Sequence, residues 1–233
     1  VPIYPGGDPI STMGSSLGLA SSDDGIHFTR IDNPPGNIVL DRTPLSHDED
    51  AVFSPHILQH EGTYYMIYTG HWWNDPKGDD PSGVFILGAT SDDGLTWTKH
   101  NKPVLLPAEW RDEEDLAFGY DWMSGIVAEA SFFLGPDGYF YLFFQGEGPD
   151  EKMRVGLARA EHPLGPYTIK PQPIISPTAG SFDDRGVIAP HVLYDSGLVR
   201  IYYNGLSEVT DPDTGETKER WLLGYAEKQW PIW

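Results

Sequence analysis

The sequence predicts an all-β fold, a β-propeller built from four-stranded blades. A motif with a glycine two residues before Ala or Thr occurs four times, at spacings of 70, 68 and 68 residues. An aromatic strand that ends in glycine precedes the last three copies, and Asp-Gly pairs mark the tight turns. A four-stranded unit that repeats every ~70 residues is typical of propeller blades, whereas a β-sandwich does not repeat at one fixed period.

The strands are expected in the same order in every unit. A short apolar strand comes first, followed by a turn, the aromatic strand, the Gly-Ala strand, a second turn and a final strand. The first strands read FSPHILQ at 53–59, AEASFFL at 128–134 and IAPHVLY at 188–194. In a propeller these first strands line the central channel, so their residues are expected to approach one another.

Turn chemistry supports the hairpins within each unit. The Asp-Gly pairs end at Gly25, Gly94 and Gly138, and each is flanked by β-forming residues. Asp-Gly between such residues is the strongest short signal for a hairpin. We therefore assign the segments SSDDGIHF and TSDDGLTW to structure and not to catalysis: Asp caps the turn and Gly permits a positive φ.

The domain boundaries leave the propeller incomplete. One domain is expected over 1–233, with blades at about 48–107, 121–177 and 183–233. A partial blade at 14–40 lacks its first two strands, and the last blade lacks its final strand. Because natural proteins avoid exposed sheet edges, we expect a fragment or an incomplete ring, whose ends pair unusually or which another chain or a missing segment completes.

Composition excludes several classes of function. Lys and Arg number 15 against 35 Asp and Glu, which gives a net charge of -20. This balance argues against nucleic acid and disfavours an anionic membrane surface. The absence of cysteine excludes disulfides, thiolate catalysis and Cys-zinc sites. No apolar run approaches the ~18 residues of a membrane span.

Glu129 is the leading catalytic candidate. Alignment of the first strands places Ser54, Glu129 and Ala189 in one column, and Glu129 lies in the otherwise apolar segment IVAEASFF. A carboxylate there is costly unless it is paired or functional. Close carboxylates shift each other's pKa, and a glycosidase needs one protonated and one ionised carboxyl. The alternative is a structural Glu satisfied by backbone or by an Arg.

Asp50 and Asp184 are the other two catalytic candidates, because both enter inner strands from the loop side. The alternative is that they are solvated loop acids, which are common. His56 and His191 share a column in different units and are expected to approach each other. They could bind substrate or a metal, or they could simply bridge strands, since buried polar groups usually find partners.

Further candidates for substrate binding lie near the loops. The indole rings of Trp72 and Trp122 could stack on apolar sugar faces, or they could serve loop packing. Glu147 follows FFQG directly and could reach the mouth of the channel. Arg185 could contact substrate or pair with Asp184.

No cofactor is expected. Two acid-rich loops resemble calcium loops only loosely, because neither has the spacing of a known hand motif, and exposed acidic turns are usually solvated. Their acids are Asp75, Asp79 and Asp80 in the first loop and Asp211, Asp213 and Glu216 in the second.

These motifs resemble the five-bladed β-propeller glycoside hydrolases, family 43 and its relatives in families 32, 62, 68, 117 and 130. The resemblance covers nearly the whole chain. Its carriers are FSPHILQHEGTYYMIYTG, EASFFLGPDGYFYLFFQG and FDDRGVIAPHVLYDSGLVRIYYNG, and the most specific is VGLARAEHPLGPY. It implies a five-bladed propeller, incomplete here at its N-terminal blade, that hydrolyses glycosidic bonds of an oligo- or polysaccharide.

The family pattern implies three axial carboxylates: a base Asp, a pKa-tuning Asp and an acid Glu. Glu129 matches the tuning position, with Glu in place of Asp, and the acid position corresponds to Ile188. The strand that would carry the base is missing. Either Asp184 or a loop acid substitutes, or the chain is a non-catalytic carbohydrate-binding propeller. A family 130 type phosphorylase would need a basic phosphate pocket, and the shortage of cations counts against it.

Overall fold

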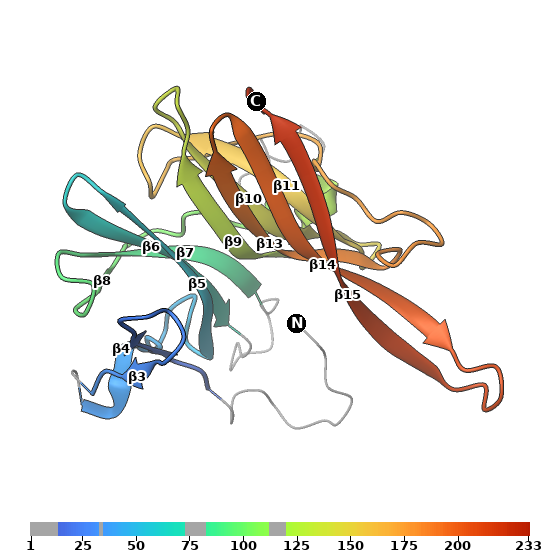
Figure 1. Cartoon of the computed structure of the whole chain (residues 1–233), viewed down its shortest axis with the longest axis horizontal. Coiled ribbons are helices and arrows are strands. Elements are labelled where there is room, and N and C mark those ends of the chain that lie inside the picture. Colours follow the sequence, from blue (N-terminus) through green and yellow to red (C-terminus); the bar gives the residue numbers. More distant parts are fainter. Residues whose placement is uncertain (1–13, 33–34, 73–82, 112–119) are drawn as a thin grey trace.

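The prediction of an all-β protein is confirmed. The computed structural model describes residues 14–32, 35–72, 83–111 and 120–233. Strands dominate these segments (Figure 1), and the helical elements are single 3-10 turns at Pro35–Asn37, Ala108–Trp110 and Asp121–Met123. No helix in this part of the chain is long and apolar enough to cross a membrane.

Fifteen strands make up the described structure. In chain order they are β1 (Leu17–Gly18), β2 (Ala20–Ser21), β3 (Thr29–Arg30), β4 (Ile38–Leu40), β5 (Ala51–His60), β6 (Thr63–Trp72), β7 (Gly83–Ser91), β8 (Thr98–Lys99), β9 (Ile126–Leu134), β10 (Phe140–Glu147), β11 (Met153–Ala160), β12 (Thr168–Ile169), β13 (Gly186–Asp195), β14 (Leu198–Thr210) and β15 (Thr217–Gln229).

The strands repeat one antiparallel pattern. Strands β5–β6–β7–β8, β9–β10–β11–β12 and β13–β14–β15 each form an antiparallel meander, and we call these groups units two, three and four. Successive units meet through single parallel pairings, Val84 with Ile126 and Met153 with Gly186. The resulting sheet curls round, and the β14–β15 hairpin extends from one end (Figure 1).

The described residues 14–32 and 35–40 form unit one, and they correspond to the third and fourth strands of the pattern. A parallel bridge joins Ser15 to Ala51, as Val84 joins Ile126. Leu17 pairs with Leu40 in the way that Ile86 bridges Leu105. These pairings match those of the later units, and the prediction that unit one is a partial blade stays a prediction.

Unit four ends at an exposed strand. Leu223 of β15 is equivalent to Ile86 of β7 and Val155 of β11. The three residues pair with equivalent positions on the strand that precedes each of them. Ile86 and Val155 are fully buried, and each bridges an outer segment, whereas Leu223 is 72% exposed. Within the described segments no strand pairs with the outer edge of β15, so that edge of the sheet is open there.

Close packing explains why each aromatic strand ends in glycine. A Cβ on Gly70 would lie 3.0 Å from the Cβ of Asp48, and one on Gly205 would lie 3.0 Å from the Cβ of Asp183. In unit three, a Cβ on Gly146 would lie 2.8 Å from the Cβ of Met123. The turn before each inner strand therefore packs directly on the backbone of the second strand, which fixes where the inner strand begins.

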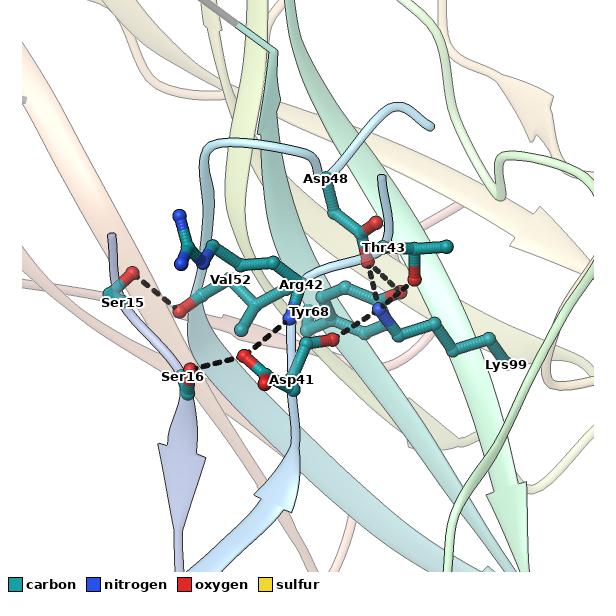
Figure 2. Close-up of polar contacts among 9 residues, drawn as sticks. All are labelled: Ser15, Ser16, Asp41, Arg42, Thr43, Asp48, Val52, Tyr68 and Lys99. Carbon is teal, nitrogen blue, oxygen red and sulfur yellow. Dashed lines mark hydrogen bonds and ion pairs between the residues drawn. The ribbon is translucent and has the colours of Figure 1, made fainter. Parts of the chain in front are cut away.

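A buried ion pair between Asp48 and Lys99 lies where the segment after β4 meets unit two (Figure 2). The carboxylate of Asp48 is fully buried, and it accepts hydrogen bonds from the ammonium of Lys99 and, at 2.9 Å, from the hydroxyl of Tyr68. Lys99 Nζ also donates to the carbonyl oxygen of Asp41 and, at 2.7 Å, to Thr43 Oγ1. One ammonium thus joins the segment that follows β4 to the start of the inner strand β5.

Three apolar clusters fill the spaces between the units. The cluster of units one and two includes Leu17 and Phe85. Units two and three share a cluster with Ile86 and Phe132, and units three and four share one that includes Val187. Each unit therefore buries its faces against its neighbours, and this stacking holds the inner strands side by side.

Replacement of Gly146 tests the packing of the turns. We expect Gly146→Ala to lower the free energy of unfolding by about 1–3 kcal/mol, because the added methyl overpacks against Trp122 and Met123. Gly125→Ala is the matched control, since its Cβ would meet only a carbonyl oxygen at 3.8 Å. Equal denaturation midpoints for the two variants would contradict this account.

Removal of the Lys99 charge tests the ion pair. Lys99→Met leaves the buried Asp48 carboxylate without its cation, and we expect a loss of about 3–5 kcal/mol in unfolding free energy. The control is Lys218→Met, which breaks an exposed pair with Glu216 and should cost about 1 kcal/mol or less. Chemical denaturation measures both, and a small loss for Lys99→Met would show that the pair is dispensable.

Candidate functional site

All three inner strands carry a β-bulge at the same position. Ser54, Glu129 and Ala189 have φ angles of 49°, 48° and 52°, in the left-handed region that non-glycine residues seldom adopt. The ladders of β5, β9 and β13 with their neighbours shift register at these points. Pro55 and Pro190 follow two of the bulged residues, which suits a position where no ladder hydrogen bond is made.

The bulges bring the three inner strands to one pit. Its volume is about 150 Å³, and it is lined by three residues from each strand. They are Ser54, Pro55 and His56 from β5, Glu129, Ala130 and Ser131 from β9, and Ala189, Pro190 and His191 from β13. The column aligned from the sequence therefore does converge in space.

Glu129 is the acid of this pit. Burial raises the pKa of its carboxyl, and a hydrogen bond with the Ser54 side chain opposes this shift. Its Oε2 is buried and has no hydrogen-bond partner among the described residues. A carboxyl with a raised pKa and an uncommitted oxygen is suited to holding a proton and passing it to a bound group.

His56 and His191 lie together beside Glu129, with ring centroids 5.6 Å apart. Burial, and to a lesser degree the neighbouring His191, lowers the pKa of His56 to about 4. His56 is therefore a neutral imidazole at pH 7, and its Nδ1 is buried without a hydrogen-bond partner in the described structure. A neutral imidazole can donate one hydrogen bond and accept another, which suits a sugar hydroxyl.

Asp50 and Asp184 do not line the pit. Both precede the inner strands, and Asp50 lies four residues before Ser54, roughly 13 Å along an extended strand. Asp50 is 6% exposed, and its backbone N–H donates to the carbonyl oxygen of His71 at 3.0 Å. Asp184 has one buried oxygen with no hydrogen-bond partner among the described residues. Their catalytic roles stay predictions.

Glu147 and Arg185 lie at the same end of the units as Asp50. Glu147 is the last residue of β10, and burial, followed by the charges of Glu151 and Asp150, raises its pKa. Arg185 is about half exposed. It forms its ion pair with Glu208 on β14 and not with Asp184, the partner that the sequence suggested as an alternative. Neither residue lines the pit, so their roles in substrate binding stay predictions.

The two tryptophans contribute to packing. Trp122 is 8% exposed, its Nε1 donates to the carbonyl oxygen of Pro171 at 2.9 Å, and its ring stacks on Phe144. Trp72 packs against the first apolar cluster, with its ring centroid 6.0 Å from that of Trp110. Neither lines the pit, so stacking of these rings on a sugar stays a prediction.

Of the two acid-rich loops, the second lies within the described residues. Asp75, Asp79 and Asp80 lie outside the described residues. In the second loop, Asp211 Oδ1 accepts hydrogen bonds from the backbone N–H groups of Asp213 and Thr214, which lower the pKa of Asp211 and close the β14–β15 turn. Across the described segments, no three His, Asp or Glu side chains are grouped so that they could hold a metal.

Thr69 and its contact with the pit were not predicted. The Oγ1 of this fully buried residue accepts a hydrogen bond of 2.8 Å from the backbone N–H of Glu129. A signal was present in the sequence, because each aromatic strand carries one polar residue just before its final glycine: Thr69, Gln145 and Asn204.

Comparison with known families agrees with this architecture. Residues 14–116 match the sequence model of the glycosyl hydrolases family 32 N-terminal domain. The resemblance to the propeller glycoside hydrolases is confirmed. The match covers unit one, unit two and the segment that follows, so it does not reach Glu129.

Two curated relatives are phosphorylases from Thermoanaerobacter sp. (strain X514). The chain is 27% identical to a 1,2-beta-oligomannan phosphorylase, over 84% of this chain and 76% of the relative. It is 35% identical to a beta-1,2-mannobiose phosphorylase, over 37% of this chain and 25% of the relative.

Solved structures share the fold at low sequence identity. A beta-1,2-mannobiose phosphorylase from Listeria innocua superposes with a TM-score of 0.62 at 14% identity, over 94% of this chain and 52% of that chain. A structure from a study of GH130 glycoside hydrolases that target beta-1,2 mannosidic linkages gives 0.59 at 24%, over 90% and 56%. Zg3597, a family 117 glycoside hydrolase from Zobellia galactanivorans, gives 0.55 at 21%, over 78% and 55%. The chain spans just over half the length of these proteins.

The buried imidazole of His56 predicts a pH dependence of stability. Its pKa is about 4 in the folded chain against 6.5 ordinarily, so the unfolded chain binds the extra proton between these values. Stability should therefore fall as pH drops from about 6.5 to about 4, by at most about 3 kcal/mol from this group. Denaturation at several pH values should show a shallower fall for His56→Gln, and an unchanged fall would contradict the assignment.

Proposed function

We propose that this chain provides one side of the active site of an enzyme that cleaves β-mannosidic bonds in oligosaccharides. The observation that carries the proposal is the pit formed by the three bulges, with Glu129 and two histidines on its wall. Support for the sugar and linkage comes from the relatives, whose names specify 1,2-beta-oligomannan and beta-1,2-mannobiose.

The size and chemistry of the pit suit one sugar ring. Its volume of about 150 Å³ equals that of protein cavities that take one six-membered ring, benzene. Its wall combines small apolar residues with the hydroxyls of Ser54 and Ser131 and the imidazoles of His56 and His191. Such a wall offers hydrogen bonds to sugar hydroxyls.

Glu129 is proposed as the proton donor. Its proton passes to the glycosidic oxygen while the bond from that oxygen to the anomeric carbon breaks. A nucleophile then bonds to the anomeric carbon. If the nucleophile is water, a base must take its proton, and Asp50 and Asp184 are the candidates. If it is phosphate, one of its anionic oxygens attacks and no base is needed.

Hydrolysis is favoured over phosphorolysis by the composition of the pit. Neither Lys nor Arg is among the nine residues that line it, and phosphate binding usually relies on such cations. The names of the curated relatives favour phosphorolysis instead. A non-catalytic sugar-binding propeller is the third candidate, since only one of the three predicted acids lines the pit.

We further propose that the units are blades of a five-bladed propeller that this chain forms only in part. The support is the recurrence of the same strand order and the same parallel junction along the chain, together with the exposed outer strand β15.

Turnover of β-1,2-mannobiose tests the function. We expect the wild type to release mannose, and Glu129→Gln to lower kcat by at least about 100-fold, because amides cannot donate the required proton. Glu61→Gln, in an exposed turn between β5 and β6, is the matched control and should behave as wild type. Release of mannose 1-phosphate only when phosphate is added would identify a phosphorylase.

Two outcomes decide against the proposal. Binding of the disaccharide by calorimetry without any turnover, with or without phosphate, would support the sugar-binding alternative. Turnover that survives in Glu129→Gln would remove Glu129 from the chemistry.

A further inference from the structure

We propose that Thr69 is a positioning residue, whose hydroxyl holds the Glu129 bulge in the conformation that directs the carboxyl into the pit. The inference deepens the proposed function and rests on it for the role of Glu129. It assigns a task to a residue that lies on a different unit and does not line the pit.

The need for such a residue follows from the ladder of β9 and β10. Residues Ser131 and Ala128 pair with Phe143 and Gln145, so two residues of β9 face one residue of β10 across the bulge. Glu129 is one of these two. In a bulge the extra residue leaves the regular ladder, so a buried N–H there must find another acceptor or remain costly.

Thr69 supplies that acceptor from the neighbouring unit. It is fully buried on β6, between Phe53 of β5 and Ile86 of β7, so its backbone is fixed on both sides. The distance of 2.8 Å from the Glu129 nitrogen to Oγ1 is that of a well-formed hydrogen bond. The contact spans 60 residues of sequence and joins units two and three at the pit.

The strain of the bulge gives the bond its importance. Glu129 has a φ of 48°, a conformation that a residue with a Cβ keeps only when its surroundings hold it there. If the backbone N–H of Glu129 loses its acceptor, rotation of the Glu129 backbone toward the ordinary extended region becomes favourable. That rotation turns the Glu129 side chain away from the pit. Displacement of a reacting group by even ~1 Å can cost about 100-fold in rate.

A related contact exists one unit further on. Ser131 Oγ accepts a hydrogen bond of 3.0 Å from the backbone N–H of Val192 on β13, close after the bulge at Ala189. In both cases a hydroxyl of one unit receives a main-chain N–H near the bulge of the next unit. The pit is thus built by contacts between units as well as within each sheet.

Three substitutions at Thr69 test the proposal. Thr69→Val removes the acceptor at nearly constant volume, and we expect kcat to fall by about 10- to 100-fold with KM changed by less than about threefold. Thr69→Ser keeps the hydroxyl and should restore kcat to within about threefold of wild type. Thr63→Val, the same change at the far end of β6, is the control and should leave kcat unchanged.

Amide hydrogen exchange provides a readout that does not need activity. In folded Thr69→Val, exchange at Glu129 should accelerate by about 10- to 100-fold, as loss of one hydrogen bond to a buried group predicts, while exchange at other β9 amides stays within about threefold. If Thr69→Val does not fold, Thr69→Ala at lower temperature serves the same comparison.

The outcomes separate this inference from the proposed function. Loss of activity in Glu129→Gln, with wild-type kcat and wild-type Glu129 exchange in Thr69→Val, overturns the positioning role alone. Full activity in Glu129→Gln overturns the proposed function, and the exchange measurement then still decides whether Thr69 holds the bulge. Equal loss of kcat in Thr69→Val and Thr69→Ser would also overturn the inference, because the hydroxyl would not matter.

Discussion

The site depends on one backbone irregularity that occurs three times. Ser54, Glu129 and Ala189 each hold a left-handed conformation at the same depth of an inner strand, which costs roughly 1–2 kcal/mol for each residue. Because a bulge sets two residues opposite one, it interrupts the alternation of side chains along the strand. Three such interruptions side by side create the pit. The packing between the units must supply the free energy that offsets the cost of these three left-handed residues.

Burial in the pit shifts the pKa values of its acid and its base in opposite directions, and both shifts favour the neutral form. It raises the pKa of Glu129 and lowers that of His56. This strongly acidic chain therefore lines the pit with an acid and a base whose uncharged forms are favoured by burial. That character suits an uncharged sugar better than an ionic ligand.

The repeated units differ in polar contacts but share backbone geometry. In units two and four a tyrosine hydroxyl donates to a buried aspartate, Tyr68 to Asp48 and Tyr203 to Asp183. In unit three the turn instead presents Met123, packed in an apolar cluster. The glycine that accepts the turn is present in all three units. The close approach of the turn to the second strand is thus the constant requirement, and the chemistry that secures it varies.

The sequence by itself determined the all-β class, the recurring strand order and the column that contains Glu129. These follow from local signals: strand periodicity, Asp-Gly turns and a motif that repeats. It did not determine that Asp50 and Asp184 lie short of the pit, that Trp122 is packed in the core, or that Thr69 contacts Glu129. Those features depend on the depth of each residue along its strand and on contacts between units some 60 residues apart, which only the tertiary packing of the units fixes.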